Sequence, residues 1–186
     1  SDIAALGANT LCIATETESI GHAIAEDITK SSYKRMAILY DESNPFMHVV
    51  ERSIEAYLAN HQGIERSSHA VSNSAGDFRS VLTRLIKVDA IVFLGHDPMG
   101  SAMAQARAMG NRAQFYTVGT ITSPGFQSLA GAAAENTRVA YWEAPRTPEL
   151  NSFLTRFERR VGRKPILELA TTPSYDAMRV LILAID

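Results

Sequence analysis

The feature that most constrains the fold of this chain is an alternation of two hydrophobic patterns between Arg35 and Gly119. Short apolar runs rich in β-branched residues predict strands. Between them, apolar residues recur at three- and four-residue spacing, which predicts amphipathic helices. One run, Ile91–Leu94, is apolar at every position, as expected of a strand covered on both faces. Because this alternation is typical of parallel strands joined by helices, it predicts an α/β fold with a doubly wound parallel sheet.

Apolar runs predict strands along most of the chain, and helical stripes lie between them. The expected strands span Thr10–Ala14, Arg35–Tyr40, Glu65–Val71, Ala90–Leu94, Gln114–Val118 and Arg138–Trp142. The helical stripes begin at Ile20, Val50, Phe78 and Met99. Gly63 and Gly110 follow helical stripes, at positions where a left-handed backbone favours glycine.

The alternation stops after Trp142. A helical stripe opens at Leu150 and ends at Gly162, Lys164–Pro173 is expected to form a loop, and Ser174–Asp186 predicts another helix. No strand is expected between these two trailing helices, so they do not continue the βα pattern.

Composition narrows the function classes. The net charge is -2 and the pI is about 6.2, so the chain lacks the basic footprint of a nucleic-acid binder, and no nucleic-acid partner is expected. One cysteine allows neither an internal disulfide nor a metal cluster built on cysteines. Nucleophile-elbow, phosphate-loop and dinucleotide-binding motifs do not occur. We therefore expect a protein that is not an enzyme and that uses neither a cofactor nor a metal ion.

Neither a membrane-spanning segment nor a leader is apparent in the sequence. No run of apolar residues is long enough to span a membrane. The first ten residues lack the basic and apolar regions of a signal peptide.

Three short segments follow the ends of expected strands. Ligands of open parallel sheets bind beyond the carboxyl ends of the strands, and those ends are followed here by Asp41–Phe46, Gly95–Met99 and Gly119–Ser123. We expect these segments to lie at one edge of the sheet. Structural interpretations of the same residues stay open. Asp97 before Pro98 is also typical of a helix start, and the side chain of Asp41 can hydrogen-bond within its own loop.

Several phrases resemble one family when their order and spacing are taken together. They are RMAILYDE (residues 35–42), DFRSVLTRLIKVDAIVFLG (residues 77–95), AQARAMGNRAQFYTVG (residues 104–119) and PSYDAMRVLILAI (residues 173–185). Over Leu11–Asp186 they resemble the leucine/isoleucine/valine-binding-protein family, the type I periplasmic solute-binding proteins of ABC importers. LacI-type effector domains share this fold, but the Asp-Phe and Tyr-Asp-Ala phrases favour the importer family.

The resemblance implies two α/β lobes that clamp a ligand in the cleft between them. Residues 10–140 match the second lobe, whereas residues 1–9 and 141–186 match the crossing segments and part of the first lobe. On this plan the chain is part of a longer protein, and the alternative is a naturally short domain. The two trailing helices would lack the sheet that they normally cover, so a homodimer of this chain is expected.

The implied function is capture of an amino acid or small organic acid for an ABC permease, in the periplasm or outside the cell. One alternative is a ligand-sensing domain of a receptor or regulator with the same fold. Another is a small α/β enzyme.

The resemblance also implies a set of ligand-binding residues. They are Phe46, as an aromatic packed on the ligand, and His96, Asp97, Gly119, Thr120 and Ile121 in the other two segments. Gly119 or Thr120 stands where amino-acid-binding members have an acidic residue that pairs with the ligand ammonium. An unpaired cation in a closed cleft is costly, so the ligand is an organic or aromatic acid unless Asp97 supplies the charge.

Overall fold

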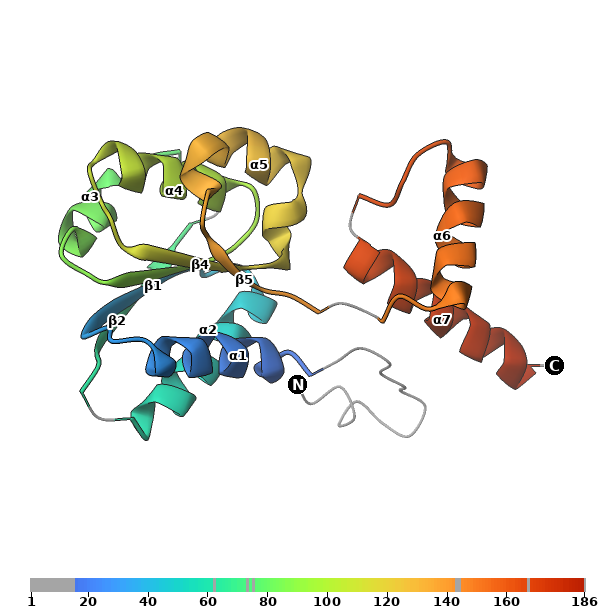
Figure 1. Cartoon of the computed structure of the whole chain (residues 1–186), viewed down its shortest axis with the longest axis horizontal. Helices are drawn as coiled ribbons and strands as arrows, with labels where there is room; N and C mark the ends of the chain where they lie inside the picture. The colour runs from blue at the N-terminus through green and yellow to red at the C-terminus, as the bar shows by residue number, and fades with distance from the viewer. Residues whose placement is uncertain are drawn as a thin grey trace. The chain divides into compact units, whose positions relative to one another are not determined.

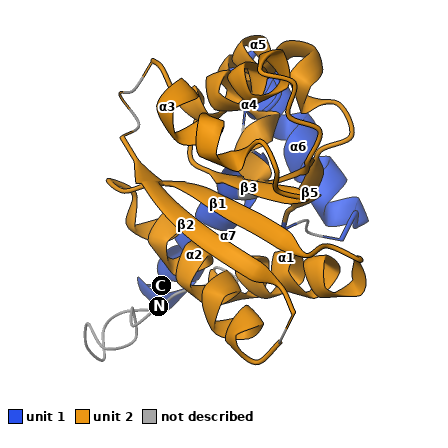
Figure 2. Cartoon of the chain, turned by 90° about the vertical axis from the view of Figure 1, so that its left-hand side faces the viewer, with its two compact units in different colours: residues 1–15, 142–186 blue, residues 16–141 orange. Residues whose placement is uncertain are grey.

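A computed structural model describes residues 16–185, with the exception of residues 62, 73, 75, 143, 144 and 167. The side chain of residue 169 is also left undescribed. Residues 16–141 form one compact unit, and residues 142–186 belong to a second (Figure 2). The expected strand Thr10–Ala14 lies outside the described residues. The assignment of residues 10–140 to a second lobe, and of residues 1–9 and 141–186 to crossing segments and a first lobe, stays a prediction.

The larger unit is built on a five-stranded sheet in which all neighbouring strands of the described residues run parallel. The strands are β1 (Arg35–Asp41), β2 (Glu65–Val71), β3 (Ala90–Leu94), β4 (Gln114–Val118) and β5 (Arg138–Ala140). Their order across the sheet is β2-β1-β3-β4-β5, so the chain starts near the middle and adds strands on both sides. The predicted doubly wound parallel sheet is confirmed.

Helices cover both faces of this sheet. On one face lie α1 (Glu18–Lys30) and α2 (Pro45–Ala59), and on the other lie α3 (Arg79–Leu82), α4 (Pro98–Ala108) and α5 (Pro124–Ala130) (Figure 1). The latter helices enclose a core in which the rings of Phe93 and Phe115 meet edge to face, with centroids 4.9 Å apart. Every residue of β3 is buried, as the uniformly apolar run predicts.

The stripe that begins at Phe78 forms less helix than expected. One α-helical turn, α3, passes into a 3-10 turn, η2 (Thr83–Leu85). The hydroxyl of Thr83 donates to the carbonyl of Arg79 at 2.8 Å, which competes with regular helix bonding. These tight turns still bury Phe78, Val81, Leu82 and Leu85, whereas Ile86 at the end of the stripe is exposed.

The second unit contains α6 (Pro148–Val161) and α7 (Glu168–Ile185). Helix α6 has Thr147 as its N-cap and ends at Gly162, which has a left-handed φ of 78°. Helix α7 starts before the predicted Ser174 and contains Pro173, so the expected loop is partly wrong. Proline has no backbone N–H and so cannot donate a helical hydrogen bond. Near it, the hydroxyls of Thr172 and Ser174 donate to the carbonyls of Glu168 and Ala170, which adds two hydrogen bonds to this part of the helix.

The predicted left-handed glycines are present at Gly63 and Gly110, with φ of 99° and 80°. Strand β5 ends at Ala140, two residues before the predicted end. In the part of the chain that the structure describes, no helix is both long and apolar enough to cross a membrane.

Candidate ligand-binding site

The carboxyl ends of β1, β3 and β4 are neighbours in the sheet, and three connecting segments leave the sheet there. The first leads from β1 into α2, the second from β3 into α4, and the third from β4 through the 3-10 turn η3 (Gly119–Thr122) into α5. These segments, or the first turn of the helix that follows, contain all the predicted site residues: Phe46, His96, Asp97, Gly119, Thr120 and Ile121.

The β1–α2 segment is held by its own side chains. One carboxylate oxygen of the buried Asp41 accepts hydrogen bonds from the backbone N–H of Ser43 at 3.0 Å and from the Ser43 hydroxyl at 2.7 Å. Asn44 is the N-cap of α2, and its Oδ1 accepts from the backbone N–H of Phe46 at 3.0 Å. This places the partly buried Phe46 in the first turn of α2 rather than in the loop.

A side-chain contact joins the first segment to the second. Nδ2 of Asn44 lies 3.1 Å from Nε2 of His96, which is exposed at the start of the β3–α4 segment. The preceding residue, Gly95, lies so close to Met99 that an added Cβ would be 2.7 Å from its Cγ. Only glycine fits there without displacing Met99, so Gly95 lets β3 turn tightly into α4.

Two hydroxyls join the second segment to the third. The hydroxyl of Thr120 donates to the carbonyl of Gly95 at 2.7 Å, and the hydroxyl of Ser123 donates to a carboxylate oxygen of Asp97 at 2.8 Å. The other carboxylate oxygen of Asp97 faces Gly125, where an added Cβ would lie 2.0 Å from it. Asp97 is therefore turned toward the β4–α5 segment.

The remaining predicted residues shape the third segment. Gly119 is buried and its carbonyl accepts from the hydroxyl of Thr122 at 2.7 Å. Ile121 is partly buried and packs against the core. The structure thus brings all six predicted residues to one edge, but Asp97, Thr120 and Ile121 also have structural partners there. A ligand-binding role for any of them stays a prediction.

The chemistry of this edge is mostly that of hydrogen-bond acceptors. The hydroxyl protons of Ser43, Thr120, Thr122 and Ser123 are all donated to protein oxygens, so these hydroxyls present lone pairs. The segments 41–46, 95–99 and 119–123 contain three carboxylates and no lysine or arginine. The edge therefore favours a ligand group that donates hydrogen bonds or carries positive charge.

The sequence interpretation did not single out Asn44. Its position before Pro45 at the start of a helical stripe is a capping signal that could have been found. The contact of Asn44 with His96 could not have been found from the sequence, because the two residues meet only when β1 and β3 pair.

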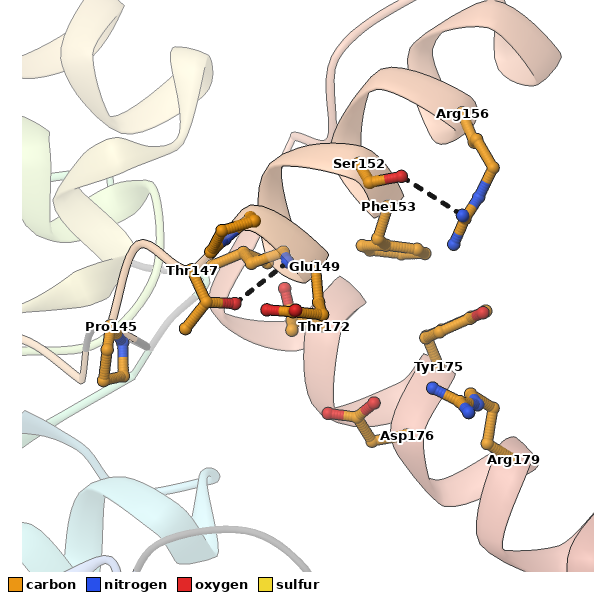
Figure 3. A pocket seen from close by; sticks show the side chains of 12 residues that line it. Pro145, Thr147, Glu149, Ser152, Phe153, Arg156, Thr172, Tyr175, Asp176 and Arg179 are labelled. Carbon is orange, nitrogen blue, oxygen red and sulfur yellow. Dashed lines mark hydrogen bonds between the residues drawn. The ribbon is translucent and has the colours of Figure 1, made fainter.

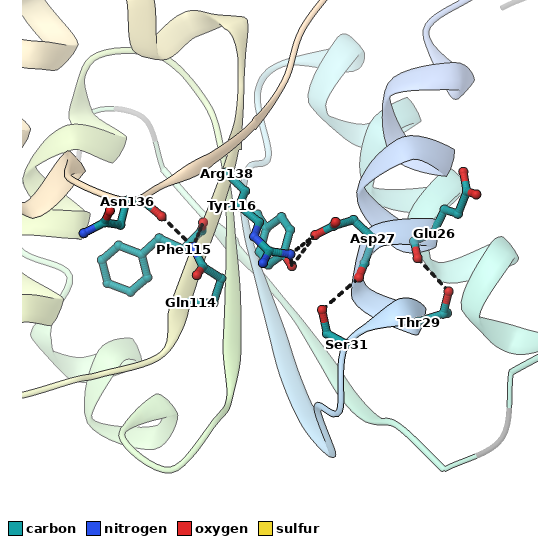
Figure 4. A network of polar contacts seen from close by, with 9 residues as sticks. All are labelled: Glu26, Asp27, Thr29, Ser31, Gln114, Phe115, Tyr116, Asn136 and Arg138. Carbon is teal, nitrogen blue, oxygen red and sulfur yellow. Dashed lines mark hydrogen bonds and ion pairs between the residues drawn. The ribbon is translucent and has the colours of Figure 1, made fainter.

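A separate polar network lies on the α1 face of the sheet. The hydroxyl of Tyr116 on β4 donates to Asp27 of α1 at 2.7 Å, and Arg138 of β5 pairs with the same carboxylate oxygen (Figure 4). Burial opposes ionisation of Asp27, but the hydrogen bonds from Tyr116 and Arg138 outweigh it and lower the pKa of this carboxyl. Burial and the bond to Asp27 raise the pKa of Tyr116. This network ties the edge strand β5 to α1.

The second unit has a groove of about 860 Å³ between α6 and α7 (Figure 3). The rings of Phe153 and Tyr175 meet across it with centroids 4.3 Å apart, and Arg146 pairs with Glu168 at 2.7 Å. The groove has both apolar rings and charged side chains, but none of the predicted site residues.

Comparison with known proteins points to one family. A family model described as "Periplasmic binding protein" matches residues 6–186. The comparison with curated proteins gave no match.

Solved structures give the same fold. A leucine-binding protein from Thermotoga maritima has a TM-score of 0.79 and 20% identity, over 93% of this chain and 51% of its own. A branched-chain amino acid transporter substrate-binding protein from Streptococcus pneumoniae, in complex with isoleucine, has a TM-score of 0.69 and 17% identity, over 87% and 49%. A fatty acid ABC transporter substrate-binding protein from Thermomonospora curvata has a TM-score of 0.69 and 16% identity, over 85% and 43%. The chain thus spans about half the length of these structures.

Proposed function

We propose that this chain, which belongs to the periplasmic binding protein family, captures an amino acid or a small organic acid and delivers it to the permease of an ABC importer. The observation that carries the proposal is the convergence of three strand-end segments at one edge, cross-linked by side-chain hydrogen bonds. Ligands of open parallel sheets bind at this place.

Pre-organisation of the edge supports a binding role. Asn44, Thr120 and Ser123 each bridge two segments or cap a helix, so the segments are held in place before a ligand arrives. A site whose groups are already ordered loses less conformational entropy on binding, which favours affinity. Periplasmic binding proteins act outside the cytoplasm, and we propose the same location for this chain.

The ligand class is limited by the charges of the edge. A donor group such as an ammonium or hydroxyl fits the lone pairs and carboxylates, whereas a ligand carboxylate needs donors from His96, from backbone N–H groups or from the facing lobe. Among structural neighbours, one is named for leucine, one is in complex with isoleucine, and one is named for fatty acid transport. These names supply the first compounds to test.

The test is to purify the complete gene product without refolding and to measure its ligands directly. Native mass spectrometry is expected to show one small molecule per protein. Titration calorimetry with L-leucine, L-isoleucine and octanoate is expected to show saturable binding of at least one compound. Absence of a co-purified solute, together with no heat from any compound, would contradict the proposal.

Cleft closure gives an independent measurement. In proteins with two lobes, a ligand held between them favours the closed arrangement, and hinge motion is the usual means. We expect small-angle scattering of the complete gene product to show a smaller radius of gyration with saturating ligand. An unchanged radius would argue against a cleft between two lobes.

A further inference from the structure

We propose that Asn44 fixes the tautomer of His96, so that His96 offers an N–H donor from Nδ1 at the ligand-facing edge. The ligand contact in this inference rests on the proposed function, whereas the tautomer does not. Its chemistry follows from two hydrogen bonds that meet at one amide side chain.

The first bond sets the orientation of the Asn44 amide. The backbone N–H of Phe46 points at this side chain at 3.0 Å as part of the α2 cap. A backbone N–H can only donate, so the atom that faces it is the amide oxygen. The other end of the amide is therefore the NH₂ group, which can only donate.

The second bond sets the tautomer of His96. Because the NH₂ group of Asn44 lies 3.1 Å from Nε2 and can only donate, Nε2 must accept. An imidazole nitrogen accepts only when it carries no proton, and a neutral imidazole then carries its proton on Nδ1. The helix cap after β1 thereby determines the hydrogen-bonding character of a residue that follows β3.

The Nδ1–H group is free to meet a ligand. His96 is exposed, and within the described ranges Nδ1 has no hydrogen-bond partner. Its neighbours at this edge are hydroxyls whose protons are already donated, and the three segments carry no lysine or arginine. His96 therefore selects for an acceptor atom, such as a carboxylate or carbonyl oxygen of the solute, and Asn44 is its positioning residue.

The tautomer can be measured without any ligand. In the ¹⁵N-labelled complete gene product at mildly alkaline pH, two-bond ¹H–¹⁵N correlations distinguish a protonated from an unprotonated ring nitrogen. The signals of His96 are identified by their loss in His96→Gln. We expect the Nδ1–H pattern, and an Nε2–H pattern would overturn the proposal.

Two substitutions keep the helix cap while changing the contact. Aspartate and serine cap helices about as well as asparagine, so Asn44→Asp and Asn44→Ser are expected to fold. In Asn44→Asp a carboxylate oxygen faces Nε2, which should move the proton to Nε2. In Asn44→Ser the contact is lost, so both tautomers should appear. An unchanged His96 pattern in both variants would overturn the proposal, and the pattern of His48 in α2 is the internal control.

A ligand titration tests the selecting role. With octanoate or L-leucine as the probe, whichever binds the wild type, the Nδ1 signal of His96 should shift. Asn44→Asp should weaken binding about tenfold, because a donor is replaced by an unpaired acceptor. Binding without any shift at His96 would overturn its contact role. If neither probe binds the wild type, the proposed solute class fails, while the tautomer measurement still decides the Asn44–His96 relationship.

Discussion

The carboxylate of Asp97 accepts a 2.8 Å hydrogen bond from the hydroxyl of Ser123, which joins the β3–α4 segment to the β4–α5 segment. Asp97 stands at the N-cap position of α4, yet its side chain makes no capping hydrogen bond. Its position at the helix start is what Pro98 predicts, whereas its bonding partner depends on the pairing of β3 with β4.

Replacing Ser123 should therefore weaken the fold at this edge. Ser123→Ala removes a hydrogen bond to a carboxylate, and we expect it to lower the free energy of unfolding by about 1–2 kcal/mol in urea titrations followed by circular dichroism. Ser128→Ala, at an exposed position of α5, is the matched control and should change it by less than about 0.5 kcal/mol. Equal effects of the two variants would show that the bond contributes nothing.

The close approach of α4 and α5 predicts a second effect on stability. A Cβ added at Gly100 would lie 2.5 Å from the backbone carbonyl oxygen of Phe126, and backbone cannot move aside as a side chain can. Gly100→Ala should lower the free energy of unfolding by about 1–3 kcal/mol.

The control for this substitution is Gly76→Ala, since a Cβ there meets no atom within 4 Å. It should leave the midpoint of urea unfolding nearly unchanged. A Gly100→Ala protein as stable as the wild type would mean that the two helices can separate at little cost.

The Asp27 network predicts a dependence of stability on pH. The folded-state pKa of Asp27 is lowered below its ordinary value of 3.8. Its contribution to stability is therefore complete above pH 3.8 and is lost as the pH falls through the lower folded-state pKa. Because the ion pair is partly exposed, we expect Asp27→Asn to cost about 1 kcal/mol near pH 6.

The loss of unfolding free energy in Asp27→Asn should become smaller as the pH is lowered below 3.8, because Asp27 of the wild type then becomes protonated and loses its negative charge. The measurement compares urea midpoints of wild type and Asp27→Asn across that range. A difference that stays constant in acid would show that the shifted carboxyl is not Asp27.

The apolar surface of α7 predicts self-association of the 186-residue chain. Leu183 and Ile185 are 72% and 83% exposed, and Met178, Leu181 and Ile182 are also more than half exposed. Apolar patches of this kind usually mark a contact surface. Analytical ultracentrifugation at micromolar concentration should show dimers or larger species.

A charge placed on this surface should reduce association. Leu183→Lys is expected to lower the dimer fraction, whereas Asn151→Lys, which adds the same charge at an exposed position of α6, should not. If the wild-type chain sediments as a monomer at all concentrations, the exposed surface of α7 is not used between copies.

Local pattern was sufficient for most of the secondary structure of the larger unit. The strands from β1 to β4 were predicted to within one residue, because alternating apolar runs and helical stripes reflect burial that is nearly independent of distant partners. Departures arose where neighbours intervene. The Phe78 stripe passes into a 3-10 turn where the hydroxyl of Thr83 bonds the carbonyl of Arg79. Helix α7 continues through Pro173, with the hydroxyls of Thr172 and Ser174 bonding nearby carbonyls.

Hydrophobic periodicity was enough to predict the fold class and the three segments that follow the ends of β1, β3 and β4. Both can be read from short stretches of sequence, because the pattern of buried residues repeats within each strand and helix. Three contacts became visible only in the folded chain: Asn44 with His96, Thr120 with Gly95, and Asp97 with Ser123. Each of these contacts joins residues far apart in the chain, and they form because parallel pairing brings the ends of β1, β3 and β4 to one edge.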